Sequence, residues 1–491
     1  MPSAPDELPL TSDRRVSGHA MRAVLGSWAR PGPAYGALAD ALRQAVLSGA
    51  LPLRTRLPSE RELAEALAVS RTTTTAAYDT LRDEGYLASR RGSGTVTTLP
   101  THLPRSAGRF QPGPGPDGLV DLTTAAPHAP DELHAAVRDA LDLLPRHLHT
   151  TGYSPGGLPE LRSAIADRYT ERGTPTTPEQ VLVTTGGQEA IHLIVGAHAG
   201  PGDRVLLEHP TYPHAIDAVR AASARPVVVP SGPDGLDPDL LASTLRQGAP
   251  RLAYLIPDHR NPTGTSLTEE VRARVRELAG RTRTLVVGDE ALTDLTLDGP
   301  EPPSFAGDGT SPYVVCLGSA SKTYWGGLRI GWVRGHRDLV GRLTVHRGHV
   351  DIGSSVLDQL VVARLIADRD TVLARRRRQL RERRDLLRTL VAQRLPSWSA
   401  NTPAGGLALW VDLGAPVSSA LAALAPRHGV RLAAGPAFGV EPGLERYLRL
   451  PFTEPPERLE QAVDGLVRAW AELGVDDTAG PTAPDPALVV V

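Results

Sequence analysis

The hydrophobic positions near the beginning of the chain repeat with the spacing of a helix. Leu38, Leu42 and Val46 lie four residues apart, which places them on one helical face. Gly49 and Pro52 follow them, and both residue types are typical of a helix end. The pattern predicts a short helix with its apolar face turned toward other elements.

Two further helices are predicted immediately afterwards. Ser59 and Glu62 have the spacing of a capping box, so a helix is expected to begin at Ser59. Residues 68–69 read as a short turn, and Ser70 is suited to cap the next helix. That helix is expected to end at Gly85.

A basic hairpin completes this first unit. Residues 87–96 read as two short strands with Gly92 and Gly94 at the tip. Helix, helix, turn, helix and hairpin over residues 34–98 predict a winged helix-turn-helix. In that architecture the helix after the turn enters the major groove of DNA, with its N-terminal residues nearest the bases.

The arginines of this unit lie where such a domain meets DNA. From residue 34 to residue 98 there are 8 arginines and 7 acidic residues, so the placement of charge, and not its sum, favours binding. The residues expected to contact DNA are Arg56, Ser59, Arg61, Ser70, Arg71, Thr72, Thr73, Arg90, Arg91 and Ser93. The residues from 71 to 73 would read bases, the arginines before them would reach phosphates, and the wing would reach the backbone or the minor groove. The alternative is a small helical docking domain whose arginines are solvated.

The same stretch resembles the GntR family of bacterial regulators. The matching residues are Leu57-Pro58-Ser59, Arg61, Leu63-Ala64, Val69-Ser70-Arg71, Ala77-Tyr78, Leu81, Glu84-Gly85 and Arg91-Gly92-Ser93-Gly94-Thr95. The resemblance implies that this unit binds double-stranded operator DNA.

The rest of the chain divides by composition and pattern. Residues 1–33 lack periodicity and are expected to form a flexible arm. Residues 99–118 contain five prolines and read as a linker. Residues 119–475 alternate strand and helix patterns, as in an α/β domain, and residues 476–491 are expected to be a loose tail.

The chain holds a single lysine. Of its 53 Lys and Arg residues, 52 are arginine and one is Lys322. A guanidinium can replace lysine as surface charge, but it does not lose a proton and so cannot attack a carbonyl. Lys322 also lies in a loop of small residues, hydroxyls and a cation at 319–332, which suits a phosphate beside an amine. This combination favours pyridoxal phosphate (PLP) on a Schiff-base lysine over a leftover surface charge.

Polar and aromatic side chains follow the predicted strands of the second unit. A glycine-rich turn at 186–190 opens a helix, and Tyr212, Asn261, Asp289 and Lys322 come after successive apolar runs. In open α/β sheets, ligands collect at the carboxyl ends of the strands. Each residue has an ordinary alternative, since Tyr212 would also suit packing and Asp289 would also suit a helix cap. The order of all five is what favours a cofactor site.

That order resembles the fold-type-I aminotransferases, over roughly residues 120–475. The resemblance implies an α/β PLP-dependent transferase fold with large and small subdomains. It implies that Lys322 forms the internal aldimine, that Asp289 pairs with the pyridine nitrogen and that Asn261 bonds the phenolic oxygen of the ring. Tyr212 would stack on the ring. The implied phosphate ligands are Gly187, Gln188, Ser319, Ser321 and Arg329.

The same resemblance implies roles for two further residues, and the chain departs from the family pattern at one place. Residues 152–162 look like a family motif whose tyrosine reaches the phosphate of the partner subunit, which makes Tyr153 a candidate. Arg449 is similar to the arginine that binds a substrate α-carboxylate. Aminotransferases, and the regulators related to them, usually place a tyrosine shortly after the aspartate, but residues 289–293 read Asp-Glu-Ala-Leu-Thr. We expect weaker tuning of the aldimine pKa and reduced turnover, with cofactor attachment unaffected.

Composition limits the environment of the protein. The net charge of −2 excludes a chain that is polybasic throughout, so any DNA site must be local. The one cysteine, Cys316, fits a reducing cytoplasm. The N-terminus lacks the apolar core of a signal peptide, and no apolar run is long enough to span a bilayer.

A GntR-type reader joined by a linker to an aminotransferase-like domain is the layout of the MocR/GabR family of regulators. The resemblance implies a homodimeric, PLP-binding transcription regulator that senses an amine, an amino acid or PLP itself through the Lys322 aldimine. Two alternatives stay open: an active aminotransferase with an accessory DNA-binding domain, and a regulator whose second domain is a cofactor-free dimerisation scaffold. Residues 375–388, with eight arginines, are expected to form a solvated amphipathic helix between the subdomains.

Overall fold

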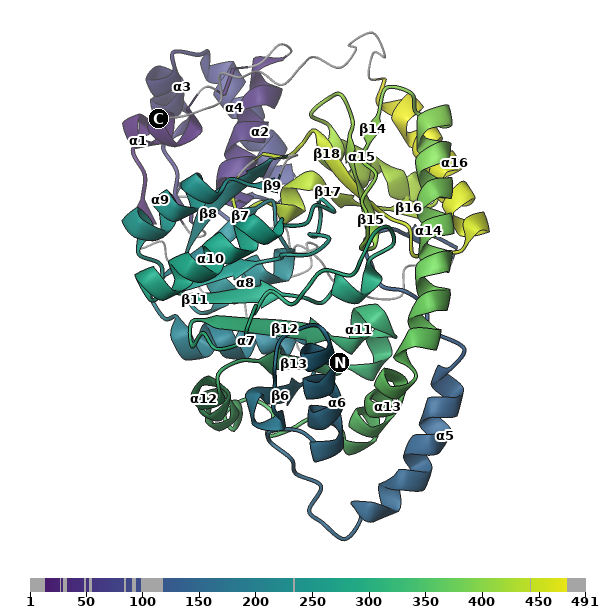
Figure 1. Ribbon diagram of the computed structural model, residues 1–491. Coiled ribbons are helices and arrows are strands. Elements are labelled where there is room, and N and C mark those ends of the chain that lie inside the picture. The colour runs from purple at the N-terminus through teal and green to yellow at the C-terminus, as the bar shows by residue number, and fades with distance from the viewer. Residues whose placement is uncertain are drawn as a thin grey trace, which may run out of the picture. The chain divides into compact units, whose positions relative to one another are not determined.

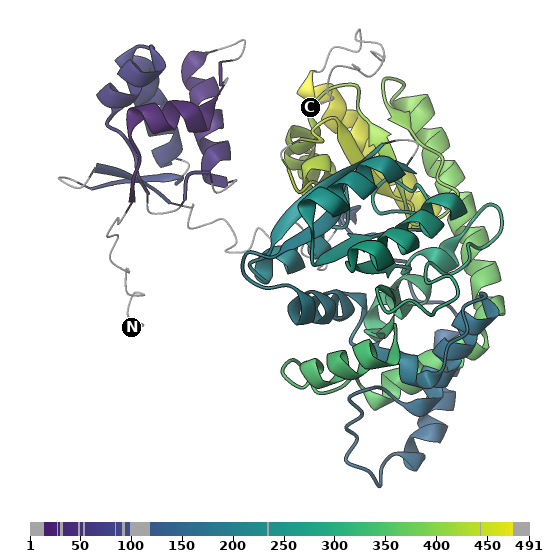
Figure 2. The ribbon, with the colours of Figure 1, turned by 60° about the vertical axis from the view of Figure 1, so that its left-hand side comes forward.

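The computed structural model divides the chain into two compact units, Met1–Ala107 and Gly108–Val491, which are described separately (Figures 1 and 2). The structure describes residues 14–26, 28–29, 33–47, 50–52, 55–83, 85–90, 94–98, 118–232, 235–441 and 443–474. The tip of the predicted wing, the predicted linker up to residue 117 and the predicted tail lie outside these ranges.

The first unit is a small helical domain with one sheet. Its elements are β1 (Arg14–Arg15), α1 (Gly18–Leu25), α2 (Ala34–Leu47), β2 (Thr55–Arg56), α3 (Glu60–Leu67), α4 (Arg71–Asp83), β3 (Leu87–Arg90) and β4 (Gly94–Thr97). The strand order is β1-β2-β4-β3, and β3 and β4 form the predicted antiparallel hairpin. Leu38, Leu63, Tyr78 and Leu81 are all fully buried in one cluster, so the three predicted helices pack as their apolar positions indicated.

The predicted capping box is present at the start of α3. The Ser59 N–H donates to Glu62 Oε2 at 2.8 Å, and the Glu62 N–H donates to Ser59 Oγ at 3.2 Å. The turn that follows passes through Ala68, whose φ of 56° is left-handed. The backbone of Thr73 then donates to Ser70 Oγ at 3.1 Å, which caps α4 as predicted.

The arm predicted over residues 1–33 is wrong for part of its length. Residues 14–25 contain a strand that pairs parallel with β2 and a helix, α1, in which Met21 is fully buried. The strand has only two residues and the helix only eight, too few for a hydrophobic period to stand out from the sequence. Residues 1–13 lie outside the described part of the chain.

The second unit is built on a mixed sheet of eight strands. Its main elements are α5 (Leu133–Leu143), α6 (Pro159–Glu171), β6 (Val181–Thr184), α7 (Gly187–His198), β7 (Arg204–His209), α8 (Pro213–Ala221), β8 (Arg225–Gly232), β9 (Gly235–Leu236), α9 (Pro238–Gly248), β10 (Leu252–Leu255), α10 (Glu269–Thr282), β11 (Leu285–Asp289), β12 (Val314–Ser319), α11 (Ala320–Thr323), β13 (Gly331–Arg334), α12 (Arg337–Arg347) and α13 (Val356–Ala367). The strand order is β6-β13-β12-β11-β10-β7-β8-β9. Strands β12, β11, β10, β7 and β8 run parallel, whereas β13 is antiparallel to both of its neighbours.

Alternate residues of the central strands point to opposite faces of this sheet. In β10, Leu252 and Tyr254 join one buried cluster, while Ala253 and Leu255 join the other. Helices α7, α8 and α12 cover the first face, and α5, α6, α9, α10 and α13 cover the second (Figure 1). Because both faces are covered, the strands read as continuous apolar runs and only their ends are open to a ligand.

A second, smaller layer follows in the chain. Its elements are α14 (Arg369–Arg394), β14 (Ser399–Ala400), β15 (Ala408–Asp412), α15 (Ser418–Leu424), β16 (Val430–Arg431), β17 (Ala433–Ala434), β18 (Tyr447–Pro451) and α16 (Pro456–Leu473), and β16 pairs with β5 (Val120–Asp121). The antiparallel sheet β14-β15-β18-β17 packs with α14 and α16 around a core of its own. Helix α14 carries Val372 in the core of the main sheet and Leu380 in the core of the small layer, so it joins the two, as Figure 1 shows in green.

The arginine run of α14 differs from its prediction in one respect. Arg376 and Arg384 are only 5% and 4% exposed, so this face is not simply solvated. Arg376 donates to the carbonyls of His128 and Tyr324, and Arg384 donates to the carbonyl of Pro403. These arginines therefore tie connecting loops to the helix, a role that a run of like charges does not reveal. Within the described residues, no helix has the length and hydropathy needed to cross a membrane.

Candidate cofactor and effector site

A cavity of about 630 Å³ lies at the carboxyl ends of the parallel strands of the second unit. It is closed on one side by residues of the small layer, among them Leu407 and Arg449. Ten of the residues predicted for the cofactor and its ligand line it: Gly187, Gln188, Tyr212, Asn261, Asp289, Ser319, Ser321, Lys322, Arg329 and Arg449. The fold brings most of these residues together because they lie between the end of a strand and the helix after it, whereas Arg449 enters the cavity from β18 of the small layer.

Lys322 lies in α11, directly after β12. Its Nζ donates a hydrogen bond to the carbonyl of Ala125 at 2.9 Å. Burial lowers the pKa of Lys322 to about 8, and the nearby Arg449 acts in the same direction, while Asp289 opposes them. A larger fraction of this amine is therefore neutral near pH 7 than in an exposed lysine. The neutral form is the one that can attack a carbonyl.

Asp289 ends β11, and both of its carboxylate oxygens accept hydrogen bonds. The Ala291 N–H donates to Oδ1 at 2.9 Å, and the Tyr254 hydroxyl donates to Oδ2 at 2.5 Å. Burial raises the pKa of Asp289, whereas these two bonds lower it. The bond to Ala291 is the local cap that the sequence left as an alternative. The carboxylate nonetheless lines the cavity, where it is fixed from two sides.

Tyr254 is a residue that the sequence reasoning missed. It lies inside β10 and is 2% exposed, in a run that reads as ordinary core. A buried tyrosine hydroxyl usually has a hydrogen-bond partner, and here Asp289 on the neighbouring strand β11 accepts the bond. A tyrosine within an otherwise aliphatic strand was the available signal.

Other residues that line the cavity supply the groups that a phosphate needs. Helix α7 begins at Gly187 and presents its first N–H groups there. Ser321 Oγ is buried and has no hydrogen-bond partner within the described part of the chain, and the Ser321 N–H donates to Ser319 Oγ at 3.3 Å. Arg329 adds a guanidinium that also donates to the carbonyl of Thr185 at 3.2 Å. A dianionic phosphate would satisfy the helix start, the hydroxyl and the cation together.

Arg449 brings a second cation into the cavity from β18 of the small layer. It is 3% exposed, and burial lowers the pKa of its guanidinium to about 10. Arg449 donates to the carbonyl of Thr123 and to Asn261 Oδ1, and its guanidinium lies over the ring of Phe438 at 4.9 Å from the centroid. These contacts hold the guanidinium in place, and its positive charge helps to lower the pKa of Lys322.

In the first unit, the predicted reading residues gather at the start of α4. Arg71 and Thr72 are exposed, and Ser70 Oγ lies 2.7 Å from the hydroxyl of Thr72 and 2.8 Å from that of Thr73. Arg61 is exposed on α3. The side chain of Arg90 and the whole of Arg91 and Ser93 lie outside the described residues, so their predicted contacts stay predictions.

Comparison with known proteins places both units in families. Residues 120–466 match aminotransferase class I and II, and residues 34–96 match the bacterial regulatory proteins of the gntR family. The chain is 32% identical to the 2-aminoadipate transaminase of Thermus thermophilus over 65% of this chain and 81% of that protein. It superposes on the crystal structure of LysN, an α-aminoadipate aminotransferase of the same species, with a TM-score of 0.67 and 29% identity over 73% of this chain and 93% of that one.

A regulator matches over more of this chain. The probable rhizopine catabolism regulatory protein MocR of Rhizobium meliloti is 31% identical over 74% of this chain and 78% of that protein. The chain belongs to the MocR-type regulators. It joins a GntR-type DNA-binding unit to an aminotransferase class I and II unit, and its cofactor is pyridoxal phosphate.

The MocR-type assignment gives the cavity residues their chemistry. PLP supplies an aldehyde to which amines add and a ring that withdraws electrons. Lys322 would hold the aldehyde end, Asp289 would face the ring nitrogen, and the groups around Gly187 and Ser321 would hold the phosphate. The unpartnered Ser321 hydroxyl and the lowered pKa of Lys322 both fit this arrangement.

Tyr153 is the one predicted cofactor residue that does not line the cavity. Its side chain is 71% exposed. The prediction assigned it to the phosphate of a partner subunit, so its role depends on a dimer and stays a prediction.

Two apolar residues take the place of the tyrosine that the MocR-type chain lacks after its aspartate. Ala291 and Leu292 both line the cavity. Tyr254 is a different tyrosine, and its hydroxyl donates to the carboxylate of Asp289.

Proposed function

We propose that the second unit binds a small α-amino acid and that this binding changes the affinity of the first unit for operator DNA. The observation that supports this most directly is that Lys322 and Arg449 line one cavity. An amino acid offers an amine that can exchange with Lys322 at the cofactor and a carboxylate that suits Arg449. Of the effectors that the sequence allowed, which included simple amines and PLP itself, an amino acid uses both groups.

The charges of the cavity support this choice. Its described lining carries Lys322, Arg260, Arg329 and Arg449 as cations, and Asp289 is the only carboxylate in that lining. Arg260 already has an anionic partner, because its guanidinium lies 2.7 Å from Glu208 Oε1. With the cofactor in place, Arg329 faces the phosphate and Asp289 faces the ring nitrogen. A simple amine would give Arg449 no new anion, and a diamine would bring a second cation without a carboxylate to receive it. An amino acid whose side chain carries no second cation fits best.

The two ligand-binding cations come from different layers. Lys322 follows the main sheet, and Arg449 lies on the small sheet. An amino acid bound at both would favour the arrangement in which the two layers are closest, and it shifts an equilibrium only through unequal affinity for its two states. The DNA-binding unit would respond through the linker.

We further infer that the regulator acts in the cytoplasm as a homodimer on two half-sites of an operator. DNA-bound helix-turn-helix dimers match two half-sites, one for each reading helix. The exposed Tyr153 and the exposed Ile352 belong to adjacent loops, since a Cβ added at the neighbouring Gly353 would lie 3.3 Å from the carbonyl oxygen of Ser154. Such apolar side chains at one place suit contact with a second copy of the chain.

The deciding experiment follows visible absorption and DNA affinity in the same samples. We expect the protein to take up PLP and to show a visible band that one or a few amino acids shift, with a matching change in operator affinity. Lys322→Ala should lose both responses while it still binds DNA. A regulator that keeps its response without PLP and with Lys322→Ala would support the cofactor-free scaffold instead.

The second candidate is an active aminotransferase with an accessory DNA-binding unit. The 32% identity to a 2-aminoadipate transaminase favours it, and the lack of a tyrosine after Asp289 speaks against it. Multiple-turnover production of keto acid from the amino acid that shifts the spectrum would support this candidate.

A further inference from the structure

Strand β1 adds an arginine to the sheet that carries the wing of the DNA-binding unit. Arg15 on β1 is paired in register with Arg56 on β2, and the Val16 N–H donates to the carbonyl of Arg56 at 3.0 Å. Paired residues of neighbouring strands point to the same face of a sheet. The side chain of Arg15 is 66% exposed, and it therefore extends the basic face to which Arg56 was assigned.

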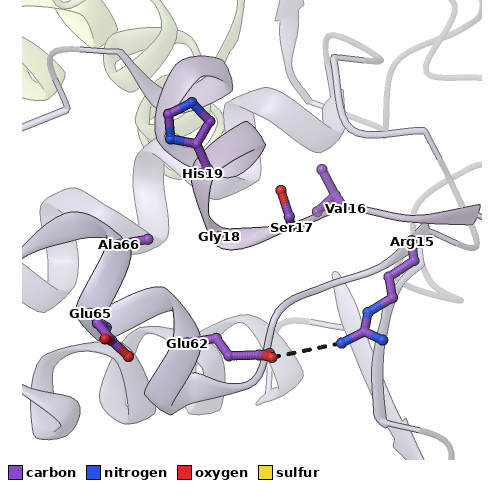
Figure 3. A pocket seen from close by; sticks show the side chains of 8 residues that line it. All are labelled: Arg15, Val16, Ser17, Gly18, His19, Glu62, Glu65 and Ala66. Atoms are coloured by element: carbon purple, nitrogen blue, oxygen red, sulfur yellow. Dashed lines mark ion pairs between the residues drawn. The ribbon is translucent and has the colours of Figure 1, made fainter.

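Glu62 forms an ion pair with this arginine. Its Oε2 accepts from the Ser59 N–H at the beginning of α3, while its Oε1 lies 3.7 Å from Arg15 Nη2. Figure 3 shows the two side chains reaching toward each other along the edge of a surface hollow of about 460 Å³. The guanidinium of Arg15 therefore lies beside the N-terminus of the first helix of the helix-turn-helix, the helix that crosses the DNA backbone in this architecture.

The segment that carries Arg15 is packed against the domain and is not a loose arm. A Cβ at Gly18 would lie 2.9 Å from the Cβ of Ala66 and 3.0 Å from the carbonyl oxygen of Glu62, so α1 begins in close contact with α3. One turn later Met21 is fully buried in the core shared with Leu63. A cation on a packed segment loses less backbone freedom on binding a phosphate than one on a flexible arm.

We propose that Arg15 contacts a DNA phosphate beside the start of α3, so that strand β1 is part of the DNA-binding surface. The proposal rests on the DNA-binding role proposed for the first unit and adds to it a residue outside the stretch that matches the gntR family. The competing explanation is that Arg15 only neutralises Glu62. The side chain of Arg15 is 66% exposed, and one ion pair at 3.7 Å uses few of the five N–H groups of its guanidinium, which favours a contact beyond Glu62.

The test measures DNA affinity of the full-length, PLP-loaded protein against salt concentration. The DNA is a duplex of about 30 base pairs, selected from a random pool for tight binding to the unaltered protein, and an unselected duplex of the same length. A phosphate contact contributes about 0.9 to the slope of log affinity against log salt. Arg15→Ala should therefore lower that slope by about 1 and weaken both duplexes by similar factors, while Arg15→Lys keeps most of the slope.

Two controls separate a phosphate contact from other effects. Arg22→Ala removes the same charge from the last turn of α1, and its slope should stay that of the unaltered protein. Glu62→Gln keeps the capping box but removes the anion, and Arg15→Ala made in that background should still lower the slope by about 1. The proposal is overturned if Arg15→Ala leaves the slope unchanged, if Arg22→Ala lowers it equally, or if Glu62→Gln abolishes the effect of Arg15→Ala.

The same measurements distinguish this proposal from the function on which it rests. Arg71→Ala, at the start of the reading helix, should weaken the selected duplex far more than the unselected one. If Arg71→Ala leaves binding of the selected duplex intact, the proposed DNA-binding role of the first unit fails. If Arg71→Ala weakens it and Arg15→Ala does not, only the contact assigned to Arg15 fails.

Discussion

Asn261 and Arg449 are joined across the cavity by a hydrogen bond in which Arg449 Nη1 donates to Asn261 Oδ1 at 3.3 Å. Asn261 follows β10 of the main sheet, and Arg449 lies on β18 of the small sheet. The bond links the two layers at the point where the carboxylate of the proposed effector would bind. A carboxylate that takes two N–H groups of this guanidinium would compete with Asn261 for Arg449.

Replacement of Arg449 by Gln should remove the carboxylate site while PLP binding persists. Loss of one partner of a buried charge pair costs roughly 2–5 kcal/mol, so the amino acid concentration for a half-maximal spectral shift should rise by a factor of about 30 or more. Absorbance titration with amino acids measures this shift. Arg446→Gln, which affects an arginine paired with Asp412 outside the cavity lining, is the matched control and should titrate like the unaltered protein. Equal responses from the two variants would argue against a carboxylate on Arg449.

The reactivity of Lys322 should rise with pH around a midpoint near 8, because burial lowers its pKa to about 8. The neutral amine is the nucleophile, so labelling of the cofactor-free protein by an amine-reactive aryl reagent should increase through that range and then level off. The labelled peptide is read by mass spectrometry, and the single lysine of the chain makes the assignment direct.

The surroundings of Lys322 predict the direction in which one substitution should shift its pKa. The negative charge of Asp289 raises the pKa of the amine, so Asp289→Asn should move the labelling midpoint to lower pH. A midpoint near that of an exposed lysine in the unaltered protein would contradict the buried setting of Lys322.

Loss of the Tyr254 hydroxyl should loosen the cofactor. Tyr254→Phe removes the donor to Asp289 Oδ2, a bond to a charged group worth about 1.5–3 kcal/mol, and so leaves the buried carboxylate with a raised pKa and a freer orientation. We expect PLP affinity to fall by about tenfold or more, measured by equilibrium dialysis. Tyr313→Phe, at a residue outside the cavity lining, should bind PLP normally. An unchanged affinity in Tyr254→Phe would mean that Asp289 does not depend on this bond.

More of the cavity than of its surroundings could be predicted from the sequence. Asn261, Asp289 and Lys322 could be placed at one edge because each follows an apolar run, and parallel strands bring their carboxyl ends together. Tyr254 could not be found this way, since a buried strand residue shows no partner until the register with β11 is known. The burial of Arg376 was missed because its partners are backbone carbonyls, among them that of Tyr324, far away in the sequence.

Residues 14–25 could not be predicted either, because their strand and helix are too short to show a hydrophobic period. Their stability should nevertheless be measurable, because Met21 is fully buried whereas Val24 on the same helix is 37% exposed. Met21→Ala should destabilise the first unit by about 2–5 kcal/mol, while Val24→Ala should have little effect. Hydrogen exchange of the α3 and α4 amides in the full-length protein reads this out, with faster exchange expected only in Met21→Ala. Similar exchange in both variants would show that α1 does not support the domain.

Leu292 offers a test of what the missing tyrosine would contribute to turnover. It lines the cavity three residues after Asp289, in the stretch where aminotransferases usually have a tyrosine. Leu292→Tyr places a phenolic hydroxyl in the cavity, and a hydrogen-bond donor near the reacting centre typically contributes 10²- to 10³-fold to rate. We expect faster formation of keto acid from the amino acid that shifts the spectrum, at least tenfold, measured under multiple turnover. Leu292→Phe adds the ring without the hydroxyl and should not accelerate the reaction, since the larger side chain alone only crowds the cavity. Equal rates in the two variants would mean that turnover is limited elsewhere, for example by the release of product from a site adapted to hold its ligand.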